Sequence, residues 1–173
     1  MNALEHKDLL LPQTRQILLM NLMVLVVHLV QTKVSGFKDL TKDTVKKVAI
    51  GDPDSVPAGM YGKQVLESLQ LYESLSAKFV FAKDVRQVLS YVETENVAAG
   101  LVYATDATVS DRVEVIATAP EDTHEPIVYP VAVIRDSIHL EAAKAFVEFL
   151  ATEEATEIFE QYGFATMATP NDG

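Results

Sequence analysis

The sequence predicts an α/β fold with a largely parallel sheet. Short runs rich in valine, isoleucine and phenylalanine alternate with longer segments whose apolar residues recur every three or four positions. Glycine, proline and aspartate separate these segments, as is typical of turns. Strands that alternate with helices of about ten to fifteen residues usually form a sheet of parallel strands joined by crossover helices.

The first thirty residues are expected to form broken helical pieces and then a strand. Residues 4–20 are interpreted as helix interrupted at Pro12, and residues 23–30 as a buried strand. The apolar run 17–30 is short for a membrane span, and His28 within it is interpreted as a core histidine. A signal peptide would need a basic start and a small-residue cleavage site, and neither is convincing here. We therefore expect buried core.

The remaining chain supplies further strands and helices. Strands are predicted at 46–50, 78–82, 98–103, 113–118 and 127–134. Helices are predicted after Pro57 and after Asp84, which is placed to cap the second. Two more are predicted near the C-terminus, with Thr152 as a cap between them and Gly163 as the stop. Their apolar faces include Phe146 and Phe149, but no further strand is predicted nearby on which these faces could pack.

Composition excludes several classes of function. The formal net charge is −11, which disfavours nucleic-acid binding because a phosphate backbone needs a basic surface. The absence of cysteine excludes disulfides and thiolate metal sites, and the four histidines lack the spacing of zinc ligands. No nucleophile elbow, P-loop or dinucleotide fingerprint is present. An enzyme is not expected, nor is a cofactor.

The first candidate binding segment is 52–59 (DPDSVPAG), where a predicted strand ends and a helix begins. Unpaired N–H groups and a partial positive charge make a helix N-terminus favourable for anions. Small residues such as Ala58 would let an oxyanion approach the backbone. The alternative is an ordinary strand-to-helix turn with Asp54 or Ser55 as its cap.

Two further candidates follow the next two predicted strands. Val85 stands in the first turn of the helix capped by Asp84, and Tyr103 ends the run AAGLVY. In open α/β sheets ligands bind beyond the carboxyl ends of the strands, where both residues would lie. The alternatives are a capped helix with Arg86 as a solvated surface residue, and a tyrosine half buried in the core.

The chain resembles the molybdate-binding proteins of bacterial ABC transporters. The segments AIGDPDSVPAGMYGKQVLESL, KDVRQVLSYVETENVAAGLVYATDA, YPVAVIRDS and EAAKAFVEFLATEEATEIFEQYGFA follow the family pattern in order and at the usual distances. The resemblance covers residues 36–166 well and residues 1–35 more loosely. The family usually has glycine where Met20 stands and proline where His28 stands.

The resemblance implies a type II periplasmic binding protein, in which two α/β lobes hold the ligand between them. It implies molybdate or tungstate as the ligand, bound by the N–H groups of Ala58 and Val85 and the hydroxyl of Tyr103. The family's other contacts come from two serine-bearing loops that would precede Met1, so the chain is expected to be truncated at its N-terminus. A membrane permease as partner and a periplasmic or cell-surface location also follow from the resemblance.

In this interpretation the chain holds one complete lobe plus the C-terminal helical part of an incomplete first lobe. Residues 1–30 would be a remnant of lobe I and the first crossover, residues 31–126 lobe II, and residues 127–173 the return crossover and the helices of lobe I. Two alternatives stay open: a non-transporting remnant that self-associates as a homodimer through exposed lobe I helices, and a binding protein for another small anion such as sulfate.

Overall fold

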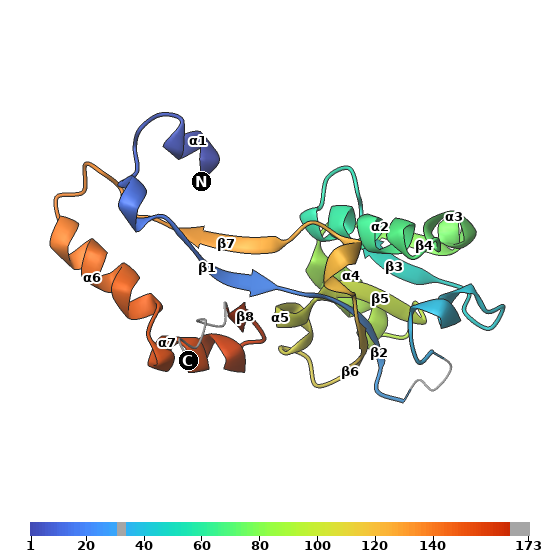
Figure 1. Ribbon diagram of the computed structural model, residues 1–173. Coiled ribbons are helices and arrows are strands. Elements are labelled where there is room, and N and C mark those ends of the chain that lie inside the picture. The colour runs from blue at the N-terminus through green and yellow to red at the C-terminus, as the bar shows by residue number, and fades with distance from the viewer. Residues whose placement is uncertain (31–33, 167–173) are drawn as a thin grey trace. The chain divides into compact units, whose positions relative to one another are not determined.

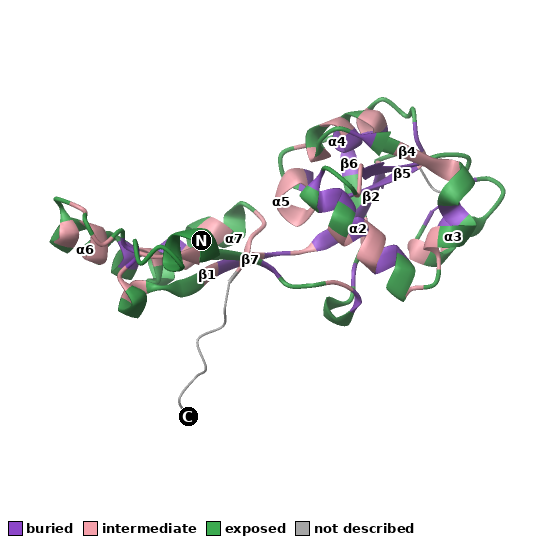
Figure 2. Ribbon diagram, turned by 90° about the horizontal axis from the view of Figure 1, so that it is seen from above, coloured by how far each residue is buried: buried purple, intermediate pink, exposed green. Residues whose placement is uncertain are grey.

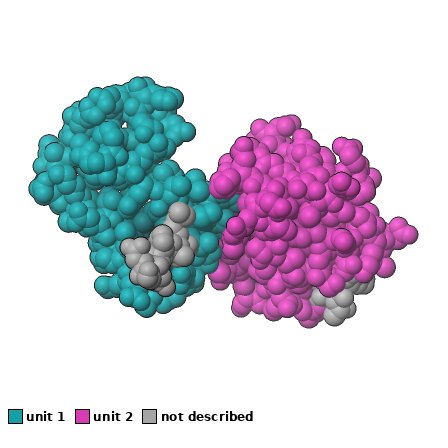
Figure 3. Space-filling model, in the orientation of Figure 1, with its two compact units in different colours: residues 1–21, 127–173 teal, residues 22–126 magenta. Residues whose placement is uncertain are grey.

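The structure, a computed structural model, describes residues 1–30 and 34–166 and divides into two compact units (Figures 1 and 3). Unit 1 comprises residues 1–21 and 127–173, and unit 2 comprises residues 22–126. Residues 31–33 and 167–173, at the edges of the predicted segments 31–126 and 127–173, lie outside the described residues.

Unit 2 is built on a five-stranded sheet in the order β4-β3-β5-β2-β6. Its strands are β2 (Met23–His28), β3 (Val48–Gly51), β4 (Phe79–Ala82), β5 (Ala99–Tyr103) and β6 (Val113–Thr118). β3 pairs in parallel with β4 and β5, whereas β2 pairs antiparallel with β5 and β6. The prediction of a largely parallel sheet is therefore wrong for two of the four strand pairings, and the sheet is mixed. The reason is that β2 alone runs opposite to the other four strands and lies between β5 and β6.

The helical elements of unit 2 connect these strands. They are the α-helices α2 (Pro57–Ser68), α3 (Tyr72–Leu75), α4 (Val85–Glu93) and α5 (Ala104–Ala107), and the 3-10 helices η2 (Phe37–Thr41), η3 (Ser76–Lys78) and η4 (Glu121–Thr123).

Helices α2 and α4 cover opposite faces of the sheet. A Cβ built on Gly62 of α2 would lie 3.5 Å from the side chain of Leu101. α4 instead packs in a buried cluster that includes Val102. Neighbouring residues of a strand point to opposite faces, so the sheet is sandwiched between the two helices (Figure 2).

The core of unit 2 is centred on β2, where residues 23–27 are at most 2% exposed (Figure 2). The expectation that the apolar run 17–30 is buried core agrees with this burial for residues 23–27, whereas Ile17, Leu29 and Val30 are 46%, 52% and 72% exposed. In the part of the chain that the structure describes, no helix is long and apolar enough to cross a membrane. Residues 23–28, predicted as part of a crossover, form β2 in this sheet. The assignment of residues 1–30, 31–126 and 127–173 to two lobes and their crossovers stays a prediction.

Unit 1 contains a three-stranded sheet in the order β7-β1-β8. Its elements are β1 (Gln16–Asn21), β7 (Ile127–Val131), β8 (Ala165–Thr166), the short helices α1 (Asn2–Glu5) and η1 (Pro12–Thr14), and the helices α6 (Leu140–Leu150) and α7 (Glu153–Gln161). The prediction that helix extends through residues 4–20 is wrong, because residues 16–21 pair antiparallel with β7 along most of their length.

The second C-terminal helix, α7, begins after Thr152 and ends before Gly163, as predicted. The Thr152 hydroxyl accepts a hydrogen bond from the N–H of Ala155 at 3.4 Å, and Gly163 has a φ of 82°, which suits a residue that ends a helix. Apolar side chains on both helices are uncovered: Phe146 is 59% exposed and Ile158 is 46% exposed.

Candidate functional site

The carboxyl ends of three neighbouring parallel strands meet at one edge of the unit 2 sheet. Gly51, the last residue of β3, is in register with Ala82, the last residue of β4. The N–H of Asp52 donates to the carbonyl of Ala82 at 2.8 Å and ties the two strand ends together. β5, on the other side of β3, ends at Tyr103. All three predicted ligand residues therefore follow or end strands at the same edge.

Ala58 is the second residue of α2, only 2% exposed, directly after the end of β3. The expectation that Asp54 or Ser55 caps this helix is wrong, because the N-cap is Val56 and makes no side-chain cap. The Asp52 carboxylate instead accepts hydrogen bonds from the Asp54 N–H at 3.1 Å and the Ser55 hydroxyl at 3.0 Å. This loop sets the start of α2 and leaves the Ala58 N–H in the first helical turn.

Val85 is the first residue of α4, and Asp84 caps the helix as predicted. The Asp84 carboxylate accepts from the N–H of Gln87 at 2.8 Å, and the Gln87 side chain accepts in return from the N–H of Lys83 at 2.9 Å. The cap thus engages the third N–H of the helix rather than that of Val85. Arg86 is exposed, as expected of a surface arginine.

Tyr103 is half buried, and its ring packs against a second tyrosine that the sequence did not single out. The rings of Tyr61 on α2 and Tyr103 are edge-to-face, with centroids 6.5 Å apart. The ring of Tyr61 also packs edge-to-face against the ring of His124, with centroids 6.0 Å apart. The spacing of Tyr61, one helical turn after Ala58, was the available signal, but it also fits an apolar helix stripe.

The electrostatics of this edge combine the half-buried carboxylate of Asp106 with backbone dipoles. Burial raises the pKa of Asp106 above its ordinary value, while the nearby charge of Arg86 and a hydrogen bond from the Tyr103 backbone oppose the rise. Two helix N-termini supply partial positive charge at the same edge. The arrangement suits an anion held by neutral donors.

Among the described residues, no group of three histidine, cysteine or acidic side chains could hold a metal ion. His28, predicted to be a core histidine, is the last residue of β2 and is half-buried. It lines a polar pocket of about 300 Å³ together with Lys46 and Lys47.

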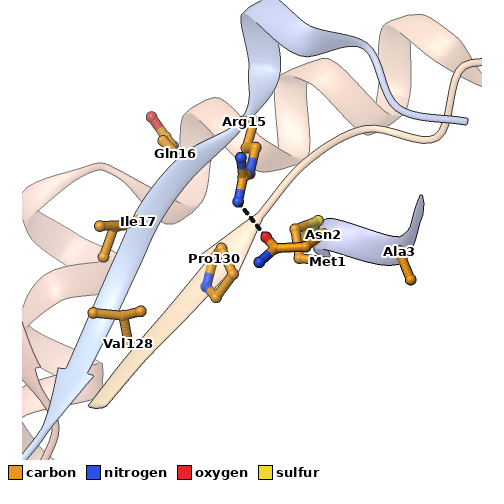
Figure 4. Close-up of a pocket in the computed structure, with 8 residues that line it drawn as sticks. All are labelled: Met1, Asn2, Ala3, Arg15, Gln16, Ile17, Val128 and Pro130. Atoms are coloured by element: carbon orange, nitrogen blue, oxygen red, sulfur yellow. Dashed lines mark hydrogen bonds between the residues drawn. The ribbon is translucent and has the colours of Figure 1, made fainter. Parts of the chain in front are cut away.

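Unit 1 has an open pocket of about 770 Å³, lined by Met1, Asn2, Ala3, Arg15, Gln16, Ile17, Val128 and Pro130 (Figure 4). The Arg15 side chain reaches Asn2 at 2.8 Å and forms an ion pair with Glu5 at 2.6 Å. Its positive charge is already engaged, and none of the three predicted ligand residues lines this pocket.

The chain matches the model of a known protein family over most of its length. The model of the family described as bacterial extracellular solute-binding protein matches residues 1–165. The chain belongs to this family. Its members bind solutes, which supports, at the level of the family, the prediction that the chain is not an enzyme.

Relatives of this solute-binding protein include named molybdate-binding proteins, so the predicted resemblance is confirmed. The chain is 41% identical over 160 residues to the molybdate-binding protein ModA of Escherichia coli, covering 87% of this chain and 60% of the relative. It is 51% identical over 131 residues to the putative ABC transporter substrate-binding lipoprotein YvgL of Bacillus subtilis, covering 76% of this chain and 50% of the relative. The chain thus spans about half to three fifths of these relatives' length.

A solved structure confirms the predicted fold class. The substrate-binding domain of a putative molybdenum ABC transporter from Clostridium difficile superposes with a TM-score of 0.92 at 43% identity, covering 96% of this chain and 72% of that one. The α/β fold of the type II periplasmic binding proteins is therefore shared. The roles of Ala58, Val85 and Tyr103 as ligands stay predictions.

Proposed function

We propose that this chain is the substrate-binding component of a molybdate or tungstate ABC uptake system and binds a tetrahedral oxyanion. The observation that carries the proposal is the common sheet edge to which Ala58, Val85 and Tyr103 belong. There two helix starts would offer backbone N–H groups and the tyrosine would offer a hydroxyl. The names of the molybdate-binding relatives support this ligand class.

The proposed chemistry is recognition of a dianion by neutral donors. Fixed N–H dipoles and one hydroxyl would replace the hydration shell of the ion without a positively charged side chain. Such a site disfavours oxyanions that carry a proton, because a bound O–H needs an acceptor. Selection of molybdate or tungstate over sulfate would depend on the size of the space that the donors surround.

We expect weak binding from residues 1–173 alone. The family resemblance implies that further donors come from two serine-bearing loops outside residues 1–173. Hydrogen bonds to charged groups contribute about 1.5–3 kcal/mol each, so two loops of donors correspond to several orders of magnitude in affinity. A calorimetric titration that gave a sub-micromolar Kd would contradict this part of the proposal.

The test is an amide NMR titration with molybdate, tungstate, sulfate and phosphate. Molybdate and tungstate should shift the amide resonances of Ala58 and Val85, and Tyr103→Phe should weaken binding about 10- to 100-fold. Phe37→Tyr, which adds a hydroxyl to a half-buried ring outside the site, serves as the control. Equal shifts with sulfate would favour a binding protein for another small anion, and no shift at Ala58 or Val85 with any anion would reject the site.

We further propose that the whole protein acts outside the cytoplasm and delivers its ligand to a membrane permease. The family is extracellular by description, and one relative is named a lipoprotein. A permease complex reconstituted with this protein should transport molybdate only when the protein is present.

The uncovered helices of unit 1 favour a second candidate, a self-associating interaction module. Phe146 on α6 and Tyr162 after α7 are 59% and 63% exposed, and large exposed apolar patches usually mark contact surfaces. Sedimentation separates the two proposals, because a monomer at all concentrations argues against self-association and a concentration-dependent dimer supports it.

A further inference from the structure

The ring of Tyr103 belongs to a row of three aromatic rings in unit 2, formed by Tyr103, Tyr61 and His124. Tyr61 presents its ring edge-to-face to Tyr103, with an interplanar angle of 61°. The same ring meets the imidazole of His124 at an angle of 66°. Aromatic pairs prefer such T-shaped arrangements at centroid separations of about 4.5–7 Å, so both contacts are favourable.

His124 is itself fixed by two hydrogen bonds around Glu125. Its Nδ1 atom lies 2.7 Å from the carbonyl oxygen of Glu125, which can only accept, so Nδ1 carries a proton and donates. The N–H of Glu125 donates to the side chain of Gln64 at 2.9 Å. Gln64 follows Tyr61 by three residues on α2. The same helix therefore contacts His124 through Tyr61 and Glu125 through Gln64.

The start of the same helix carries Ala58, three residues before Tyr61. Residues three apart on a helix lie on the same side, and Ala58, Tyr61 and Gln64 therefore form one row. In this row Ala58 is a proposed N–H donor, Tyr61 contacts the ring of Tyr103, and Gln64 accepts the hydrogen bond from Glu125. A shift of Tyr61 would change the orientation of the Tyr103 hydroxyl relative to the Ala58 N–H.

We propose that Tyr61 is a positioning residue for the oxyanion site, holding the Tyr103 ring so that its hydroxyl and the Ala58 N–H face one ion, with the His124 ring packed against Tyr61 as well. This inference rests on the proposed function. Tyr61 makes no contact with the ion in this scheme and acts through Tyr103.

The test uses the full chain labelled with 3-fluorotyrosine and observed by ¹⁹F NMR. The chain has six tyrosines, and the Tyr103 resonance is assigned by its loss in Tyr103→Phe. Tyr61→Leu removes the contacting ring, and Tyr61→Phe retains it. Tyr72→Leu is the matched control, because it removes a tyrosine of unit 2 from a different aromatic pair, that with Phe79.

Tyr61→Leu should shift or broaden the Tyr103 resonance and weaken the binding of sodium molybdate about 2- to 10-fold, while Tyr61→Phe and Tyr72→Leu leave both nearly unchanged. His124→Ala should shift the resonance in the same direction by less, which keeps the proposal testable if Tyr61→Leu does not fold. The double variant Tyr61→Leu/Tyr103→Phe should bind no more weakly than Tyr103→Phe alone, because Tyr61 acts only through the hydroxyl.

An unchanged Tyr103 resonance in both Tyr61→Leu and His124→Ala overturns the inference, as do additive losses of affinity in the double variant. The failure of the proposed function is a different result: the parent chain binds no molybdate at millimolar concentration, while Tyr61→Leu still shifts the Tyr103 resonance. That outcome rejects the oxyanion site and supports the positioning of the ring.

Discussion

The backbone of Gly59 lies directly against the backbone of Gly51, so α2 touches the end of β3 with no side chain between them. A Cβ added to Gly59 would lie 2.2 Å from the carbonyl oxygen of Gly51, well inside van der Waals contact. A Cβ on Gly51 would in turn lie 2.9 Å from the nitrogen of Gly59. This contact sets the distance between the strand end and the helix start that carries Ala58.

Gly59→Ala should therefore destabilise unit 2 and displace the start of α2. Because the obstacle is backbone rather than a flexible side chain, we expect a loss of about 1–3 kcal/mol in the free energy of unfolding. Urea unfolding measures the loss. Gly36→Ala is the control, since a Cβ there meets nothing within 4 Å, and it should change stability little. Equal stability of the two variants would show that α2 can move away freely.

Asp84→Ala should loosen the first turn of α4. The carboxylate caps the N–H of Gln87, and loss of such a cap costs about 1 kcal/mol. Asp84→Asn keeps an acceptor at the same place and should retain most of the stability. Hydrogen exchange of the Gln87 and Val88 amides checks the prediction locally. Faster exchange in both variants would mean that the charge, rather than the hydrogen bond, stabilises the helix start.

The candidate loops could be predicted from sequence because their signals are local. Gly51 and Pro53 mark the end of one strand, Pro57 the start of a helix, and Asp84 a cap, and each acts within a few residues. The structure places Ala58, Val85 and Tyr103 where these signals indicated. Tyr61 and His124 were missed because their contact joins residues 63 positions apart, which no local pattern records.

Local sequence signals could not predict that residues 16–21 form a strand, nor that β2 pairs antiparallel with β5. The run QILLMN is apolar without alternation, and such short runs fit helix or strand equally. Its partner β7 lies more than a hundred residues further along the chain, with Asn21 opposite Ile127. That non-local pairing decides the strand, and likewise the antiparallel entry of β2 beside β5 makes the sheet mixed.

Asp106→Asn should stabilise the protein at neutral pH. Burial raises the pKa of Asp106 from its ordinary 3.8, so the folded state holds the charged form at a cost. This cost is present above the raised pKa and is relieved as the pH falls through it toward 3.8. The advantage of the variant, followed by thermal unfolding between pH 7 and pH 4, should therefore shrink on acidification. Asp111→Asn, an exposed site in the same unit, is the control; a pH-independent difference would contradict the assignment.

Asp39→Asn should remove an acid-sensitive contribution to stability. Hydrogen bonds from Lys42 and Ser35 lower the pKa of Asp39 from 3.8 to about 2. The contribution is present above 3.8 and is lost as the pH falls toward about 2, so wild type and variant should converge over that window. Acid titrations of both proteins monitored by circular dichroism test this. Asp43→Asn, an exposed neighbour, should leave the acid transition unchanged.

Phe146→Ser/Phe149→Ser should reduce self-association of the chain through the exposed apolar face of α6. The two rings are 59% and 42% exposed and lie on the same helix three residues apart, so they present one apolar surface. Their exposure means that the substitutions remove little burial within unit 1, and the unfolding temperature should change by only a few degrees.

Sedimentation equilibrium over a range of concentrations should show a dimer in the parent chain and a monomer in the variant. Val109→Ser, which removes an apolar side chain that is 75% exposed in unit 2, separates a specific face from general hydrophobicity. A parent chain that stays monomeric, or a variant that dimerises equally well, would assign the exposed phenylalanines no part in assembly.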